Sequence, residues 1–340
     1  RSLKFAVSGL LLALILRHVG WRPAFTQFTT TSVWLLASAG LLLAVAVCLA
    51  AWRWKFVLSV GGGAFGLDRL VPYTFVGYFF NQALPSTIGG DGVRAWLVYR
   101  DGASASLAIR SVLIERALGL MILVVLSAAG LPRLLAALGL GAPQIWAVMV
   151  LVGAGLAAGI VTLVILRNGS SLDRFRIGRG IRALATDAIA LLSRRQSLAA
   201  FVALTVAGQV LGCVMIWLIG LAVSSPMSLF DTLTVMPTVF VFSALPISIA
   251  GWGVREGVML VGLGLVGVAA NEAVLISVLF GLLNVLVGLA GGAMWLMMGH
   301  RRPVAGVTEM NRAADGAQLS VPHAGSLERN AGGTAQTKLR

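Results

Sequence analysis

The sequence has 340 residues and little of what catalysis or metal binding needs. Only 11% of its residues are charged, and it contains two cysteines and three histidines. Cys48 and Cys213 lie inside apolar stretches, and the histidines show no metal-ligand spacing with each other or with the cysteines. We therefore expect no disulfide, no metal site and no cofactor.

Motifs for nucleophilic catalysis and nucleotide binding are also missing. The chain has no GxSxG nucleophile turn, no GxxxxGK[ST] phosphate loop and no HExxH. The run Gly89–Gly92 (GGDG) lacks the preceding strand and the GxGxxG spacing of a dinucleotide loop. These absences predict a protein that is not an enzyme. A membrane enzyme that acts on a lipid headgroup is the alternative hypothesis.

Apolar residues dominate instead. Hydrophobic residues make up 58% of the chain and the mean hydropathy is positive, which indicates an integral membrane protein and excludes a soluble one. The excess of 26 basic over 12 acidic residues would suggest nucleic acid for a soluble domain. In a membrane protein it indicates cytoplasmic loops beside anionic lipid headgroups, so no nucleic-acid partner is predicted.

The apolar stretches predict an all-α, polytopic helical bundle. About 20 apolar residues are needed to cross a bilayer as a helix. Six stretches are read as spans: Leu3–Leu16, Val33–Trp52, Ser104–Ala128, Ile145–Leu166, Leu198–Val223 and Glu272–Met298. Two further pairs are short or borderline: Leu70–Leu84 with Val93–Tyr99, and Leu229–Leu245 with Val254–Val268.

One segment occurs twice. LPSTIGGDGVR (Leu84–Arg94) returns as LPISIAGWGVR (Leu245–Arg255), 161 residues later, with seven of eleven positions identical. A repeat of this kind predicts two similar halves. We expect one repeat over about 1–142, a second over about 143–299, and a disordered cytoplasmic tail over 300–340.

Arginine placement orients these halves. Residues 167–195 carry seven arginines and the tail after Met298 carries six basic residues, whereas residues 224–230 carry none. The basic segments are predicted to be cytoplasmic, in a bacterial inner membrane with both chain ends inside. Each copy of the motif then lies at the tip of a re-entrant helical hairpin, entering from the cytoplasm in the first half and from outside in the second. This arrangement describes two inverted-topology repeats.

The segment 178–196 is amphipathic. It predicts a helix lying on the cytoplasmic membrane surface, with a solvated linker as the alternative.

Each copy of the repeated motif combines a helix-breaking proline with glycines and an arginine. Pro85 and Pro246 are expected to end the incoming helices, and new helices are expected to start near Val93 and Val254. The glycines between them allow tight turns and close approach of neighbouring backbone; they are Gly90, Gly92, Gly251 and Gly253.

A helix start favours an anion, and Arg94 and Arg255 stand within the expected first turns. We interpret the two opposed tips as a site for an anionic group between the halves, in which Asp91 and Glu256 orient the arginines. In the alternative interpretation the hairpins only pack, and Arg94–Asp91 and Arg255–Glu256 are internal ion pairs.

Other polar residues lie at depth. Glu115 and Arg116 are near the middle of a predicted span, where they either neutralise each other or reach the site. Glu115 is also a hypothetical proton carrier. Amides in the apolar stretches are expected to form hydrogen bonds between helices; they are Asn81, Gln82, Gln209 and Asn284.

The two repeated motifs, together with SVLIERALGL (Ser111–Leu120), resemble the flippase-like membrane family named for the transmembrane region of lysylphosphatidylglycerol synthase. The resemblance reaches to about Met298. It implies a lipid flippase, since the membrane domain of that synthase resembles one that moves aminoacylated phosphatidylglycerol outward. Relatives without the synthase domain are associated with hopanoid and polyprenyl-linked lipids. No aminoacyl-transferring domain is expected here.

We therefore predict a transporter for an anionic, phosphate-bearing lipid, namely a phospholipid, a hopanoid-type lipid or a polyprenyl phosphate. A membrane subunit that presents lipid to a separate synthase is a further alternative. A homo-oligomer or a lipid-synthase partner is compatible with either role.

Overall fold

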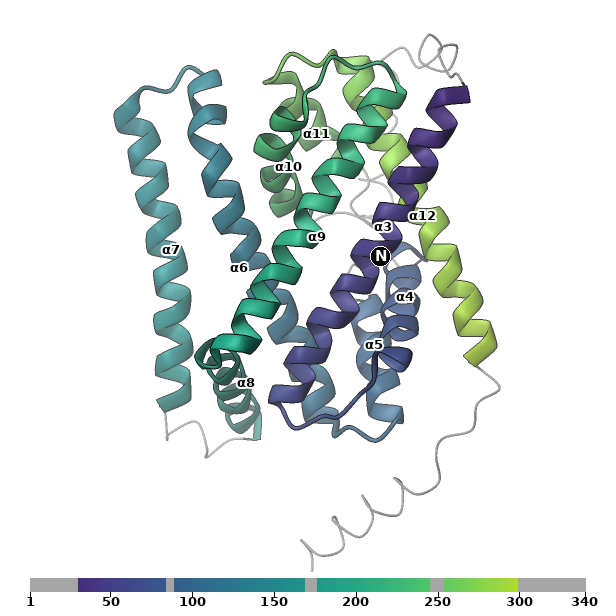
Figure 1. Cartoon of the computed structure of the whole chain (residues 1–340). Helices are drawn as coiled ribbons and strands as arrows, with labels where there is room; N and C mark the ends of the chain where they lie inside the picture. Colours follow the sequence, from purple (N-terminus) through teal and green to yellow (C-terminus); the bar gives the residue numbers. More distant parts are fainter. Residues whose placement is uncertain (1–29, 84–88, 169–175, 245–253, 299–340) are drawn as a thin grey trace, which may run out of the picture.

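The computed structural model describes residues 30–83, 89–168, 176–244 and 254–298, and these ranges are helical with no strand (Figure 1). Five of the described helices are long and apolar enough to cross a membrane. They are α3 (Thr30–Val60), α6 (Ala105–Ala137), α7 (Ala142–Asn168), α9 (Arg195–Ala222) and α12 (Ala270–Met298). The all-α, multi-pass prediction is confirmed. The predicted span Leu3–Leu16 and the tail 300–340 lie outside the described residues.

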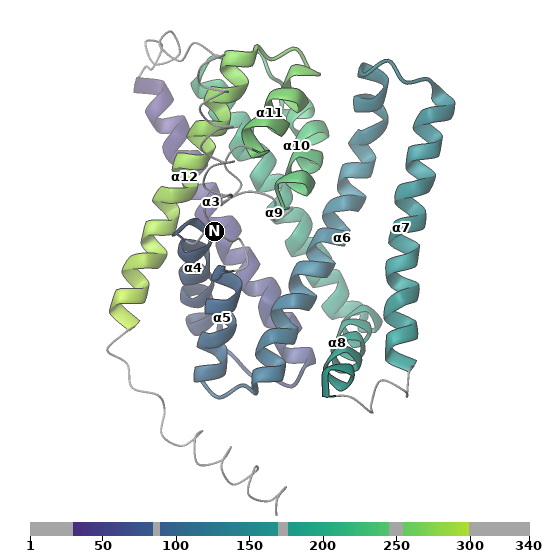
Figure 2. The same cartoon turned by 180° about the vertical axis from the view of Figure 1, so that it is seen from behind.

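Four shorter helices form two pairs. The first helix pair is α4 (Leu67–Ala83) with α5 (Gly89–Arg100), and the second is α10 (Leu229–Ser243) with α11 (Val254–Gly264). The two pairs occupy opposite ends of the bundle, the first in the lower half and the second in the upper half of Figure 1, and the view from behind agrees (Figure 2). Pro85 and Pro246 lie outside the described residues.

A capping box starts α10. The Ser228 side chain accepts a hydrogen bond from the Asp231 backbone N–H at 3.1 Å, and the Asp231 carboxylate accepts one from the Ser228 N–H at 3.2 Å. Asp231 also forms an ion pair with Arg133 of α6 at 2.8 Å. These contacts hold the outer end of the second pair against α6.

The first helix of each short pair packs on the last long helix of the other half. α4 packs on α12, α10 packs on α6, and α3 packs on α9. Glycines make both close approaches possible: a Cβ added to Gly291 would lie 2.0 Å from Phe75 O, and one added to Gly130 would lie 2.3 Å from Thr234 O. Gly130 and Gly291 are separated by 161 residues, which is the offset of the repeated motif. Gly130 and Gly291 therefore occupy equivalent positions of the repeat, and each allows a short helix to pack closely on a long one.

The amphipathic segment is a helix, α8 (Arg176–Ser193), and not an irregular linker. Ala188 and Leu191 are buried against a cluster that includes Val57 and Phe201. Asp187 forms an ion pair with Arg110 of α6 at 3.2 Å. α8 lies at the same end of the bundle as the first helix pair (Figure 1).

Candidate anion-binding site

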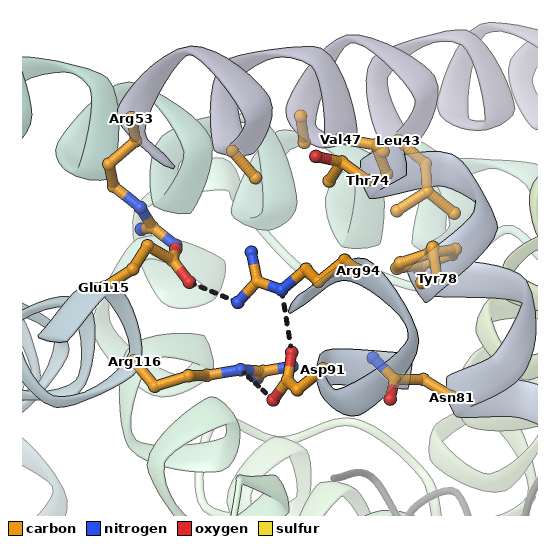
Figure 3. Close-up of a pocket in the computed structure, with 13 residues that line it drawn as sticks. Leu43, Val47, Arg53, Thr74, Tyr78, Asn81, Asp91, Arg94, Glu115 and Arg116 are labelled. Carbon is orange, nitrogen blue, oxygen red and sulfur yellow. Dashed lines mark hydrogen bonds and ion pairs between the residues drawn. The ribbon is translucent and has the colours of Figure 1, made fainter. Parts of the chain in front are cut away.

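A cavity of about 230 Å³ lies between α3, α4, α5 and α6 (Figure 3). One wall is apolar and comes largely from α3, whereas the other carries charged side chains from α5 and α6. The lining residues are Leu43, Ala46, Val47, Ala50, Arg53, Thr74, Gly77, Tyr78, Asn81, Asp91, Arg94, Glu115 and Arg116. Four of the predicted site residues, Asp91, Arg94, Glu115 and Arg116, are thus brought together.

Arg94 is held from three sides. Its Nε donates to Asp91 Oδ1 at 3.0 Å and its Nη2 donates to Glu115 Oε2 at 2.6 Å. Its guanidinium carbon lies 4.9 Å from the centre of the Trp54 ring, which is a cation–π contact. Arg94 is only 5% exposed. The Arg94–Asp91 pair of the packing interpretation therefore exists, but as part of a larger network.

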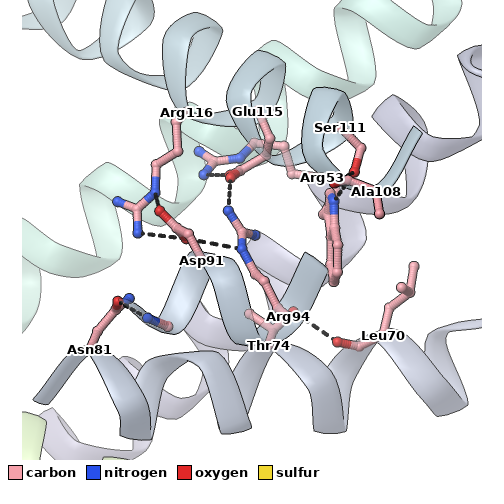
Figure 4. A network of polar contacts seen from close by, with 12 residues as sticks. Arg53, Leu70, Thr74, Asn81, Asp91, Arg94, Ala108, Ser111, Glu115 and Arg116 are labelled. Carbon is pink, nitrogen blue, oxygen red and sulfur yellow. Dashed lines mark hydrogen bonds and ion pairs between the residues drawn. The ribbon is translucent and has the colours of Figure 1, made fainter. Parts of the chain in front are cut away.

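That network is a chain of alternating charges across α3, α5 and α6 (Figure 4). Arg53 pairs with Glu115, Glu115 with Arg94, and Arg94 with Asp91. Arg116 closes the chain, with its Nε 2.8 Å from Asp91 Oδ2 and its Nη2 donating to Asp91 Oδ1 at 3.1 Å. Arg53 also reaches Thr205 of α9 at 3.4 Å.

Of the two alternatives for Glu115 and Arg116, the structure favours the second, because both residues line the cavity and they do not pair with each other. Consecutive helical residues point about 100° apart, so Glu115 is buried while the Arg116 side chain is 51% exposed. Each finds its partner on another helix. The Glu115 carboxylate pairs with the guanidinium groups of Arg53 and Arg94, so it has the position of a fixed counter-charge to them. The proton-carrier hypothesis stays a prediction.

The start of α5 differs from the prediction. The chain is already helical at Gly89, so Gly90 and Gly92 lie in the first turn and Arg94 lies in the second. The Gly90 N–H donates to Asn81 Oδ1 at 3.0 Å, so one amide expected to face an anion already has a partner.

The two first-turn glycines have different surroundings. A Cβ at Gly90 would lie 1.8 Å from Gly77 O, whereas one at Gly92 would meet nothing within 4 Å. Close approach of α4 therefore requires Gly90. Gly92 is not required for a tight turn, contrary to the prediction.

The second pair holds its arginine in a similar way. α11 begins at Val254, as predicted. Arg255 Nη2 donates to Glu256 Oε1 at 2.6 Å, and the guanidinium carbon lies 5.2 Å from the centre of the Phe280 ring. Ser277 Oγ donates to the same Glu256 oxygen at 3.4 Å. Arg255 and Glu256 do not line the cavity of Figure 3, and Gly251 and Gly253 lie outside the described residues.

Tyr78 connects the cavity to α12. It lines the cavity beside Arg94, and its hydroxyl donates to Asn284 Oδ1 on α12. The hydrogen bonds of Asn81 and Asn284 connect helices, as the sequence predicted for these amides.

Sequence reasoning missed Arg53. The predicted span ended at Trp52, which left Arg53 at a membrane boundary, but α3 continues to Val60. The sequence signal that could have found it is indirect, since a buried carboxylate such as Glu115 needs a cationic partner. Arg53, one of the two arginine partners of Glu115, lies 62 residues before it in the sequence, and no local sequence pattern connects these two residues.

These features define a class: a multi-pass helical membrane protein with a charged network beside an apolar wall. Within the described ranges, no group of three or more His, Cys, Asp or Glu side chains could hold a metal ion. A family model described as "Lysylphosphatidylglycerol synthase TM region" matches residues 1–292. The chain therefore belongs to this family, a membrane-protein family connected with lipid by its description. No curated protein matches the chain.

Proposed function

We propose that the protein binds the phosphate-bearing headgroup of an anionic lipid at the ends of the two helix pairs and passes it between the leaflets. The observation that carries this proposal is the cavity of Figure 3, which is lined by Arg53, Arg94 and Arg116 together with the apolar side of α3. Arginine binds phosphate oxygens through charge-assisted hydrogen bonds. A buried charged cluster in a membrane protein is expensive, and such clusters are typical of transport pathways.

The first short helix of each half packs on the last long helix of the other half, and this reciprocal packing supports two inverted repeats with re-entrant hairpins. α4 on α12 and α10 on α6 are equivalent contacts if the halves are related by a two-fold axis in the membrane plane, and Gly291 and Gly130 occupy the same repeat position in them. Secondary transporters with this architecture bind their substrates where the repeats meet and move one repeat against the other. In this proposal Arg94 serves one side of the membrane and Arg255 the other.

The arginines of α8 support a cytoplasmic location for its end of the bundle, because basic residues concentrate on that side. The first helix pair then opens toward the cytoplasm of a bacterial cell, and both chain ends are on that side of the inner membrane. A lipid-synthesising enzyme that supplies the substrate fits the same orientation as a partner.

Reconstitution tests the proposal. The purified protein in liposomes should move fluorescent phosphatidylglycerol between leaflets, measured by chemical quenching of the outer leaflet. Arg94→Ala and Arg255→Ala should each slow this movement at least about tenfold, because a charge-assisted hydrogen bond contributes about 1.5–3 kcal/mol. Lys55→Ala is the control, since Lys55 is exposed on α3 and does not line the cavity.

Two results would contradict transport. One is the absence of lipid movement by folded protein, and the other is full activity in both arginine variants. Mass spectrometry of the recovered lipid separates transport from the alternative enzymatic function, because a transporter leaves its lipid chemically unchanged.

A further inference from the structure

The charges around the cavity do not cancel. Among the described residues that line the cavity, three arginines (Arg53, Arg94 and Arg116) face two carboxylates (Asp91 and Glu115), which gives 3 − 2 = +1. The two segments that precede α5 and α11 in the sequence, 84–88 and 245–253, read LPSTI and LPISIAGWG and contain no ionisable side chain. They therefore add nothing to this balance. The ion pair of Arg255 with Glu256 is neutral as a unit.

The hydrogen bonds show the same imbalance. All four carboxylate oxygens already accept from guanidinium groups: Glu115 from Arg53 and Arg94, and Asp91 from Arg94 and Arg116. Within the described residues, the Nε of Arg53 is buried without a hydrogen-bond partner. The cavity thus has a buried donor without a partner, while each oxygen of its two carboxylates already accepts from a guanidinium group.

We infer that the cavity selects a phosphodiester headgroup with a single negative charge, to which Arg53 and Arg116 donate together with Arg94, while Arg94 keeps its pairs with the carboxylates. This inference rests on the proposed function and names its substrate class. Arg116 suits the role because its side chain is half exposed, and Arg53 because it lines the cavity with a surplus donor.

Charge balance gives the physical reason. Net charge in a low-dielectric site is costly, and one monoanion brings the lining from +1 to zero. A phosphomonoester carries a charge of about −1.5 to −2 near neutral pH and would leave the occupied site with a net negative charge. A zwitterionic headgroup would leave +1 and place its ammonium beside three guanidinium groups.

The apolar wall favours a lipid over a soluble phosphodiester. Leu43, Ala46, Val47 and Ala50 line the cavity along one side of α3. A lipid can lay the glycerol end of its acyl chains on this wall while its phosphate meets the arginines, whereas a soluble diester leaves the apolar wall exposed to water.

Binding selectivity tests the inference. The whole protein is placed in nanodiscs containing phosphatidylglycerol, phosphatidic acid and phosphatidylethanolamine with identical acyl chains, and the co-purified lipids are quantified. We expect phosphatidylglycerol to be enriched at least about tenfold over each of the other two. Arg53→Gln and Arg116→Gln, each made alone, lower the net charge of the lining from +1 to zero. Each variant should lose the preference for phosphatidylglycerol over phosphatidylethanolamine.

Arg110→Gln is the matched control. Arg110 also lies on α6 and is paired with a carboxylate, but it does not line the cavity. This variant should keep the selectivity, and the thermal midpoint of each variant shows whether it is folded. Equal retention of phosphatidic acid and phosphatidylglycerol by the unaltered protein, or unchanged selectivity in both folded cavity variants, would overturn the inference.

Two further measurements separate a lipid from a soluble ligand, and charge selection from transport. Millimolar glycerophosphoglycerol should not displace the lipid, and displacement would overturn the lipid assignment. In the liposome assay, equal transport of all three lipids would overturn charge selection while supporting transport. Selective retention of phosphatidylglycerol without transport would support charge selection and overturn the proposed transport function.

Discussion

Glu115 is the residue on which the charged network depends most, because its carboxylate pairs with both Arg53 of α3 and Arg94 of α5. Its two oxygens accept from Arg53 and Arg94, and its own helix supplies Arg116, which binds Asp91. Removing the carboxylate would therefore leave two arginines without their shared partner at depth. The neighbouring Arg116 cannot compensate, because it carries the wrong charge and points elsewhere.

We expect Glu115→Gln to destabilise the protein by about 3–5 kcal/mol, since breaking a buried ion pair leaves uncompensated charge. Differential scanning fluorimetry in detergent would show this as a lowered midpoint. Asp187→Asn is the matched control: Asp187 pairs with one arginine near the surface, and its loss should cost at most about 1 kcal/mol. A transport pH profile altered by Glu115→Gln and kept by Asp187→Asn would contradict the fixed counter-charge and favour the proton carrier.

At the scale of the helices, packing of the short helices depends on backbone contact. Gly130 and Gly291 each meet a carbonyl oxygen of the opposite half at a distance that leaves no room for a methyl group. Small residues at such positions allow helices to approach closely in a membrane, where the hydrophobic effect gives little help. The described parts of α4 and α10 have 17 and 15 residues, fewer than the five candidate spans, and both helices make these contacts.

Gly130→Ala and Gly291→Ala should each destabilise the protein by about 1–3 kcal/mol, as expected for overpacking. Gly155→Ala is the control, because a Cβ at Gly155 on α7 would meet nothing within 4 Å. The measurement is the thermal midpoint of each purified variant. If one of the two interface variants were neutral and the other damaging, the equivalence of the two contacts would be wrong.

For the whole molecule, transport in the proposed manner requires the halves to move against each other. Ser127 Oγ on α6 and Thr238 Oγ1 on α10 lie 2.7 Å apart, so this pair is the position at which we test a disulfide between the two helices. This pair joins the two halves at the contact between α6 and α10.

We expect Ser127→Cys with Thr238→Cys, made in a background in which Cys48 and Cys213 are alanine, to form a disulfide under oxidation and to lose lipid transport at least about tenfold, with recovery on reduction. The single-cysteine variants are the controls and should transport under both conditions. Undiminished transport by the fully cross-linked protein would contradict movement at this contact.

The local sequence determined the membrane class and most of the helices. Long apolar runs have one stable solution in a bilayer, because a helix satisfies every backbone group within itself. For the same reason the predicted spans agree with α3, α6, α7, α9 and α12. The start of α5 was less predictable, because glycines that usually mark turns serve here for close packing at Gly90.

The internal repeat also identified Arg94 and Arg255 as the arginines to examine, since each closes one copy of the motif. Only the tertiary structure decided the rest of the site. Arg53 belongs to the site because α3 extends past the predicted boundary. Glu115 pairs with Arg53 and Arg94 on other helices and not with the adjacent Arg116. Ion pairs depend on which side chains meet across helices, and that follows from packing between segments far apart in the chain.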